Sequence, residues 1–545
     1  MPPTLETTAG PSARRPAARR TALRSWRPHP VPLLALALAV PLYALWAAYL
    51  GTGGGDLAAQ VAWRDFTGQH PGTPYNLSWY GGIHVASYSL LSPCLMAVLG
   101  VRTVTVMAGL AGSWLAACLF VRSGMRRPLW PALLATLTLW ADVASGRSTF
   151  ALGTAVGLAA CLAVTGPARR PATAAVCAAL ATMASPAAGL FLLVVGAARL
   201  LTREFATAAA LLAPPVVVIG ATSLLFPLDG VQPMQTDDIW KPLLFGAVLA
   251  VAGPREWRAL RRGALVYMAG IVLTVLIDSP VGSNVVRLAE LFAPPALLAA
   301  LLAPGLHAVR RVDAVRRLAL ALALALSVNW VAQHTVQVLK MSTPVPAWAT
   351  HTEGVVAALD RLGAGRTRVE VVPAVNHRET TALAPHVDTA RGWNRQVDVE
   401  RGALFYDGSF SARTYRAWLD RWAVGFVVLP EATPDWAAED EAALVRSGPA
   451  WLEPVWRDAH WRVYRVRDAT ALVSGPASVV RAGAAALTVR VEEPGPVTVR
   501  IAYSRWLRTD GGCLERAGQW TRLRVSEPGE YRISSSYRLP WQGGC

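Results

Sequence analysis

The chain has 545 residues, of which 53% are hydrophobic and only 16% charged, and its mean hydropathy is +0.34. Soluble domains are about 25% charged, so this composition indicates an integral membrane protein. The net charge of +17 reflects arginines that lie mainly in short clusters between apolar runs, the positive-inside pattern of cytoplasmic loops. The sequence has no zinc-finger spacing, aromatic RNA-binding motif or groove-reading basic helix, so we expect no nucleic-acid partner.

Residues 1–30 contain the arginine-rich stretch ARRPAARR and predict a disordered, basic cytoplasmic tail. The apolar run that follows, VPLLALALAVPLYALWAAYLG, is longer than the apolar core of a signal peptide and lacks a clear small-x-small cleavage site. Since roughly 20 apolar residues span a bilayer, this run predicts a retained first membrane helix.

An external loop, residues 51–83, is expected after this helix. Gly53, Gly54 and Gly55 free its backbone, and from Asp56 the sequence predicts a short amphipathic helix lying in the membrane interface. Its apolar face comprises Ala59, Ala62, Trp63 and Phe66. Asp56 would then lie at the membrane surface and point into an outer cavity. An aspartate after glycines is also a good helix N-cap, and capping and catalysis are compatible.

The rest of this loop offers weaker candidates. Asp65 is a second acid, with a solvated pairing to Arg64 as the simpler interpretation. The aromatic residues fit an interfacial belt or a surface on which a sugar stacks, and His84 is an interfacial polar residue. These candidate sugar or acceptor contacts are Tyr75, Trp79, Tyr80 and His84.

Basic loops set the expected topology of the membrane module, residues 31–335, because arginine-rich loops stay cytoplasmic. Two crossings fit between each consecutive pair of loops, and a last run, 318–332, leads outward. Residues 84–121 hold two apolar stretches, and we expect one of them to be a half-crossing or re-entrant piece. The result is about eleven transmembrane helices, a cytoplasmic N-terminus and an extracytoplasmic C-terminus. The basic loops are SGMRRP (123–128), GPARRP (166–171), RLLTREF (199–205), GPREWRALRRG (253–263) and HAVRRVDAVRR (307–317).

The C-terminal region predicts two extracytoplasmic parts. Residues 340–470 have an α/β pattern, with helical spacing at 354–363 and 413–422 and strands at 368–372 and 424–430. Residues 471–545 contain alternating strands at 487–491, 497–503, 521–525 and 531–537, joined by EEPGP and SEPGE turns, which favour a small β-sandwich. Cys513 and Cys545 lie in this part, and an extracytoplasmic location would allow a disulfide between them.

This layout resembles the GT-C glycosyltransferases, multi-pass enzymes that take sugars from polyprenyl-phosphate carriers. The resemblance lies in one helix, a long external loop with an early acid, many short helices and a C-terminal extracytoplasmic domain. GGIHVASYSLLSP (81–93) and Ala184-Ser185-Pro186 are similar to family features, and RGWNRQVDVERGALFYDG (391–408) resembles poorly characterised bacterial members. The matching position for the family's candidate base is Asp56, in GGGD, and direct attack on the anomeric carbon would make the enzyme inverting.

Transfer from a lipid phosphate needs cations at the leaving group. Arg147 and Arg287 are the candidates, near the outer ends of helices, and Asn284 would orient the phosphate or sugar. An alternative partner of Arg287 is Glu290, and Asp142 is expected to pair with Arg147.

Asp237 and Asp238 form an adjacent acid pair in an external loop, to bind a cation or the acceptor or simply to face solvent. No cofactor is firmly indicated, although a divalent cation could take part.

Three functions therefore remain open. The first is a membrane glycosyltransferase that moves a sugar from a polyprenyl-phosphate donor to a cell-envelope glycan or lipid acceptor, with Asp56 as general base. The second is a multi-pass transporter, against which stand the lack of a repeated half and the large outer domain. The third is a non-catalytic scaffold for envelope assembly.

Overall fold

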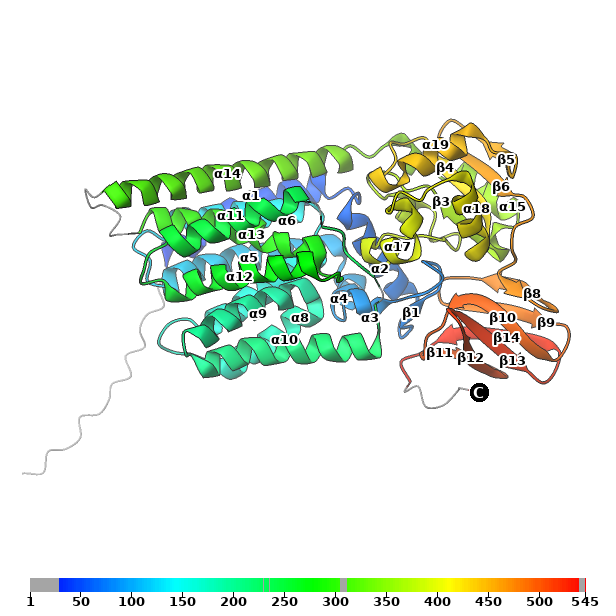
Figure 1. Cartoon of the computed structure of the whole chain (residues 1–545), viewed down its shortest axis with the longest axis horizontal. Coiled ribbons are helices and arrows are strands. Elements are labelled where there is room, and N and C mark those ends of the chain that lie inside the picture. The colour runs from blue at the N-terminus through cyan, green and yellow to red at the C-terminus, as the bar shows by residue number, and fades with distance from the viewer. Residues whose placement is uncertain (1–28, 229, 235, 304–310, 539–544) are drawn as a thin grey trace, which may run out of the picture.

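The computed structural model describes residues 29–228, 230–234, 236–303, 311–538 and 545 (Figure 1). Figure 1 shows a bundle of helices at one end and a β-rich C-terminal region at the other, with α14 leading from one to the other. The predicted cytoplasmic tail lies, up to residue 28, outside the described residues.

The bundle is that of a polytopic membrane protein. Within the described ranges, six helical segments are long and apolar enough to cross a membrane: α1 with η1, α5, α10, α12, η2 with α13, and α14. Shorter apolar helices accompany them, and every run predicted to cross is helical. The number that cross stays a prediction. The bounds are α1 (Pro30–Leu45), η1 (Trp46–Leu50), α5 (Val101–Arg122), α6 (Leu129–Ala144), α7 (Ser148–Ala163), α8 (Pro171–Ala184), α9 (Pro186–Leu201), α10 (Phe205–Leu225), α11 (Thr236–Ala252), α12 (Arg258–Leu276), η2 (Gly282–Val286), α13 (Arg287–Leu301) and α14 (Arg311–Ser342).

The difficult stretch 84–121 contains one short and one long helix. α4 (Ser92–Leu99) has 8 residues and α5 has 22. At about 1.5 Å per residue, α4 reaches about 12 Å, well short of the roughly 30 Å hydrocarbon core. The helix lengths therefore agree with the predicted half-crossing.

Small residues let the bundle helices approach closely, as is usual in membrane proteins. A Cβ built at Gly109 of α5 would lie 2.2 Å from the Tyr43 ring of α1. One at Gly153 of α7 would lie 2.8 Å from Ser185 and Ala188. These glycines are needed for the space they leave between helices.

The loop after the first helix is a compact layer between the bundle and the C-terminal region (Figure 1). It contains α2 (Asp56–Gln69), the antiparallel pair β1 (Tyr75–Asn76) and β2 (Ile83–His84), and α3 (Val85–Tyr88). The predicted amphipathic helix is present, but its expected contact with the membrane interface is wrong. Trp63 is 1% exposed and belongs to an apolar cluster with Trp79 and Val397, so the apolar face of α2 packs against the protein itself.

An α/β unit, residues 347–466, follows α14. Its sheet has the order β3-β4-β6-β5, with β3 and β4 parallel and the other pairs antiparallel. The predicted helical stripe packs under the sheet, since Tyr415, Trp418 and Trp422 are buried. The elements are η3 (Ala347–Ala349), α15 (Glu353–Arg361), η4 (Ala364–Arg366), β3 (Arg368–Val371), α16 (Glu379–Ala382), α17 (Arg395–Arg401), η5 (Ala403–Phe405), α18 (Ala412–Arg421), β4 (Val424–Pro430), η6 (Trp436–Ala438), α19 (Glu439–Ser447), β5 (Leu452–Arg457) and β6 (Trp461–Val466).

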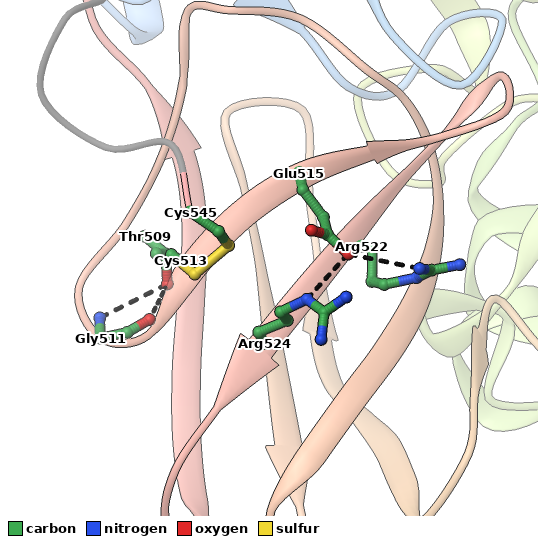
Figure 2. The surroundings of a disulfide bond; sticks show 7 residues. All are labelled: Thr509, Gly511, Cys513, Glu515, Arg522, Arg524 and Cys545. Carbon is green, nitrogen blue, oxygen red and sulfur yellow. Dashed lines mark hydrogen bonds and ion pairs between the residues drawn. A yellow bond between two sulfur atoms is a disulfide. The ribbon is translucent and has the colours of Figure 1, made fainter.

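A β-sandwich, residues 473–535, ends the described fold. Its two sheets have the orders β12-β13-β10-β7 and β11-β14-β9-β8, and their alternating apolar residues form one core. All four predicted strands are present, and a disulfide joins Cys513 to Cys545 as predicted (Figure 2). The strands are β7 (Val473–Ser474), β8 (Ala477–Ala482), β9 (Ala486–Val491), β10 (Gly495–Ala502), β11 (Leu507–Thr509), β12 (Cys513–Ala517), β13 (Trp520–Val525) and β14 (Gly529–Ser535).

Candidate functional site

A cavity of about 650 Å³ lies between the bundle and the α/β unit. Its walls come from α2, α7, α9, α10, α13 and α14, among other segments, and residues 393–396 of the α/β unit close it on the other side. Among its lining residues are four of the predicted site residues: Asp56, Arg147, Asn284 and Arg287. Residues distant in sequence and selected for different chemical reasons therefore meet in one cavity.

Asp56 is the first residue of α2 and enters the cavity with a side chain that is 35% exposed. Gly55 occupies the N-cap position with φ +64°, and no side chain caps the helix. The alternative interpretation of Asp56 as an N-cap is therefore wrong, although its charge still suits the positive end of the helix dipole. In the described part of the chain, both of its ion pairs use Oδ2, so Oδ1 is available to accept a proton.

Arg147 lies at the centre of a cluster of charged side chains. Its Nη1 donates to Glu290 Oε2 at 2.5 Å and approaches Asp142 Oδ1 at 3.4 Å, and its Nε lies 3.8 Å from Asp56. Its Nη2 lies 3.1 Å from His334 Nε2, which must accept because a guanidinium only donates. The predicted pairing of Arg147 with Asp142 is confirmed, but most of its hydrogen-bonding capacity is used by protein groups.

Arg287 has more freedom to meet a ligand. The alternative that Glu290 pairs with it is wrong, because Glu290 turns to Arg147 instead. Arg287 contacts Asp56 Oδ2 at 3.6 Å, lies over the Phe150 ring at 5.5 Å and keeps 22% of its side chain exposed. Because its one carboxylate contact is longer than those of Arg147 with Glu290 and Asp142, Arg287 is the arginine that is more open to an incoming anion.

The N-terminal ends of α2, α7, α9 and α13 all contribute to the cavity wall. Asp56 and Arg287 are first residues of their helices, and Arg147 and Ser185 are N-cap residues. Helix N-termini carry partial positive charge and unpaired N–H groups, which favour an anion. The cavity thus combines one accessible carboxylate with two arginines and the N-terminal ends of helices.

The predicted sugar-stacking residues lie elsewhere. Tyr75, Trp79, Tyr80 and His84 are each 6% exposed or less and are not among the lining residues. The Tyr75 hydroxyl donates to Ala502 O at 3.0 Å, and the Tyr80 hydroxyl donates to the Gly392 carbonyl at 2.8 Å. These side chains join the loop to the C-terminal region, so we do not retain a sugar-binding role for them.

His84 is also unsuited to acid–base work. Its Nε2 lies 2.9 Å from Ser504 Oγ in the contact with the β-sandwich. Burial lowers the pKa of His84 to about 4, so it stays neutral at ordinary pH. This agrees with its interpretation as a polar residue without a catalytic role.

The other acid candidates are not part of the described cavity. Asp65 pairs with Arg64, as its simpler interpretation predicted, and does not line the cavity. α11 begins at Thr236, but the side chains of Asp237 and Asp238 lie outside the described residues.

Sequence reasoning missed several cavity residues. Gln60 and Tyr88 form a hydrogen bond beside Asp56, and His334 reaches the cavity from α14. The α/β unit adds Trp393 and Arg395. A polar Gln60 one turn after Asp56 and a histidine inside an apolar helix were usable signals. Residues 393–396 lie in the stretch 391–408 that carries part of the resemblance, but nothing in it indicated that it lines the cavity.

A divalent cation does not fit this arrangement. The described residues hold no group of three or more His, Cys, Asp or Glu side chains placed to bind a metal. The acids near the cavity are already compensated, Glu290 and Asp142 by Arg147 and Asp56 by two arginines. We therefore derive no catalytic step through a metal.

Residues 474–516 match the family described as a domain of unknown function, DUF8823, which covers β8 to most of β12. No curated protein matches the sequence.

Among solved structures, arabinofuranosyltransferase AftD from Mycobacteria is similar at 14% identity and TM-score 0.42, covering 93% of this chain and 57% of that one. A point mutant of the same protein gives 12%, 0.41, 92% and 59%. This chain thus spans under three-fifths of their length.

Proposed function

We propose that the protein is a GT-C-like membrane glycosyltransferase that moves a sugar from a polyprenyl-phosphate donor to a glycan or lipid acceptor. The observation that carries this is the meeting of Asp56, Arg147, Arg287 and Asn284 in one cavity at the C-terminal-region end of a membrane bundle. With the arginine-rich loops in the cytoplasm, this end faces outward, so transfer takes place on the outer face of the cytoplasmic membrane.

The proposed chemistry uses the Asp56 carboxylate, Arg287 and the helix N-termini together. An acceptor hydroxyl attacks the anomeric carbon, Asp56 Oδ1 takes its proton, and the phosphate leaves with the electron pair of the broken C–O bond. Arg287 leaves Asp56 Oδ2 and, with the helix N-termini, stabilises the phosphate charge that grows in the transition state. Arg147 stays with Glu290 and faces the phosphate side of the cavity as a second cation, while Asn284 orients the phosphate. Attack opposite the leaving group inverts the anomeric configuration.

The test measures sugar transfer by the full chain, purified and reconstituted into membranes, with radiolabelled polyprenyl-phosphate sugars as donors. Asp56→Asn should lower turnover by about 10²–10⁴-fold, the usual contribution of a general base. Asp65→Asn is the matched control, an acid on the same helix that does not line the cavity, and should keep full turnover.

Equal turnover in wild type and Asp56→Asn would remove Asp56 from the mechanism. Absence of turnover by the wild type with every donor would contradict a transferase and favour the transporter or the scaffold.

A further inference from the structure

The turn that precedes Asp56 needs contacts from other parts of the chain to keep one conformation. It reads Gly51-Thr52-Gly53-Gly54-Gly55, and Gly53 and Gly55 adopt φ values of +90° and +64°. Glycine backbone has the largest conformational freedom of any residue, so such a turn needs outside contacts to stay in one conformation.

Those contacts come from the α/β unit. Arg378 Nη1 donates to the Thr52 carbonyl at 2.6 Å, and its Nη2 donates to Thr52 Oγ1 and to the Ser342 carbonyl, both at 2.8 Å. Thr52 Oγ1 in turn donates to Ser342 O at 2.8 Å. One buried guanidinium therefore ties the turn to the end of α14.

The guanidinium also occupies the space beside the glycines. A Cβ on Gly54 would lie 3.1 Å from Arg378 Nη2, closer than an ordinary contact, so the guanidinium would have to shift by a few tenths of an ångström. The backbone around Arg378 adds a further contact, because Gly55 N donates to the Asn376 carbonyl at 2.7 Å. The next residue in the chain is Asp56.

We propose that Arg378 is a positioning residue, which fixes the turn 51–55 and thereby places the Asp56 carboxylate between Arg147 and Arg287. The inference rests on the proposed function of Asp56. The α/β unit would then complete the active site of the bundle through Arg378, although Arg378 does not itself contact the reacting atoms. A misplacement of about 1 Å costs a reaction about 10²-fold, so this contact would control turnover.

The test uses the full chain with Arg378→Ala, Arg378→Lys and Thr52→Val. Arg361→Ala is the control, since Arg361 is an exposed arginine of the same unit that donates within its own helix. Arg378→Ala should lower kcat about 10- to 100-fold with KM changed less than about threefold, and Arg378→Lys should recover part of the loss. The double variant Thr52→Val/Arg378→Ala should lose little more kcat than Arg378→Ala alone, because both substitutions act through one contact.

Hydrogen exchange of residues 51–57 supplies a readout that needs no substrate. In Arg378→Ala these amides should exchange at least tenfold faster while those of β4 and α5 stay protected, as in a folded protein. Unchanged exchange at 51–57, or a kcat equal to that of Arg361→Ala, would overturn the inference. Inactivity of the wild type would instead count against the proposed function and leave the exchange result to decide whether Arg378 holds the turn.

Discussion

Replacing Arg147 with methionine tests whether the charge cluster holds the bundle together. Methionine keeps an apolar stem of similar length but removes the charge, leaving Glu290 and Asp142 without their arginine. At an effective dielectric constant of about 20, the 2.5 Å contact with Glu290 corresponds to about 7 kcal/mol and the 3.4 Å contact with Asp142 to about 5 kcal/mol of gross attraction. Desolvation of the arginine cancels much of this.

The expected net loss is about 3–5 kcal/mol, since the remaining carboxylates stay buried without a partner. Arg490→Met is the control, because Arg490 and Glu530 form an exposed pair with side chains 59% and 48% accessible. That pair should contribute less than about 1 kcal/mol. The measurement is the free energy of unfolding in detergent micelles, followed by tryptophan fluorescence.

A double-mutant cycle sharpens the test. Glu290→Gln removes the carboxylate charge that Arg147→Met leaves without a partner. The double variant should therefore lose at least about 1 kcal/mol less unfolding free energy than the sum of the two single losses. A loss for Arg147→Met no larger than that of Arg490→Met, or strict additivity, would refute the reasoning.

Three further predictions concern other parts of the fold. Reducing the Cys513–Cys545 bond, with 32 residues of sequence separation, should destabilise the β-sandwich by about 3–4 kcal/mol in denaturant unfolding, and a loss under about 1 kcal/mol would contradict this. Gly146→Ala should lower the free energy of unfolding by well above the roughly 1–2 kcal/mol expected for Gly124→Ala in the same assay. Both glycines have positive φ, but a Cβ at Gly146 would lie 2.6 Å from Leu57 N, whereas nothing lies within 4 Å of a Cβ at Gly124. Burial alone would lower the pKa of His377, but its contacts with Asp435 and Glu379, each at 3.4 Å, raise it. Protonated His377 therefore stabilises the fold fully below its unfolded pKa of about 6.5, and this stabilisation is lost as pH rises through the higher folded pKa. The fall in Tm between pH 6 and 9 should accordingly be smaller in His377→Gln than in wild type.

Local patterns in the sequence were sufficient for the elements and for part of the site. Apolar runs between arginine clusters predicted the bundle helices, and alternation predicted the strands of the β-sandwich, because these periodicities come from backbone geometry within one element. Asp56 was identified because its place after the first helix resembles that of the family's candidate base. Arg147, Arg287 and Asn284 were identified because transfer from a lipid phosphate needs cations and polar groups, and they lie near the outer ends of helices, where such residues are costly unless they are used. Their cavity could be expected, but of their pairings only that of Arg147 with Asp142.

Only the tertiary structure decided how these groups are paired and held. Glu290 lies one turn from Arg287 in α13, yet it pairs with Arg147, which is 143 residues away. Tyr75, Trp79 and Tyr80 have the composition of a sugar-binding surface, but the same aromatic residues serve equally well in a buried contact between segments. Arg378 reaches Thr52 across 326 residues, and no local pattern marks it. Sequence periodicity reports which face of an element is apolar, whereas the partner of a polar group depends on which distant elements pack beside it.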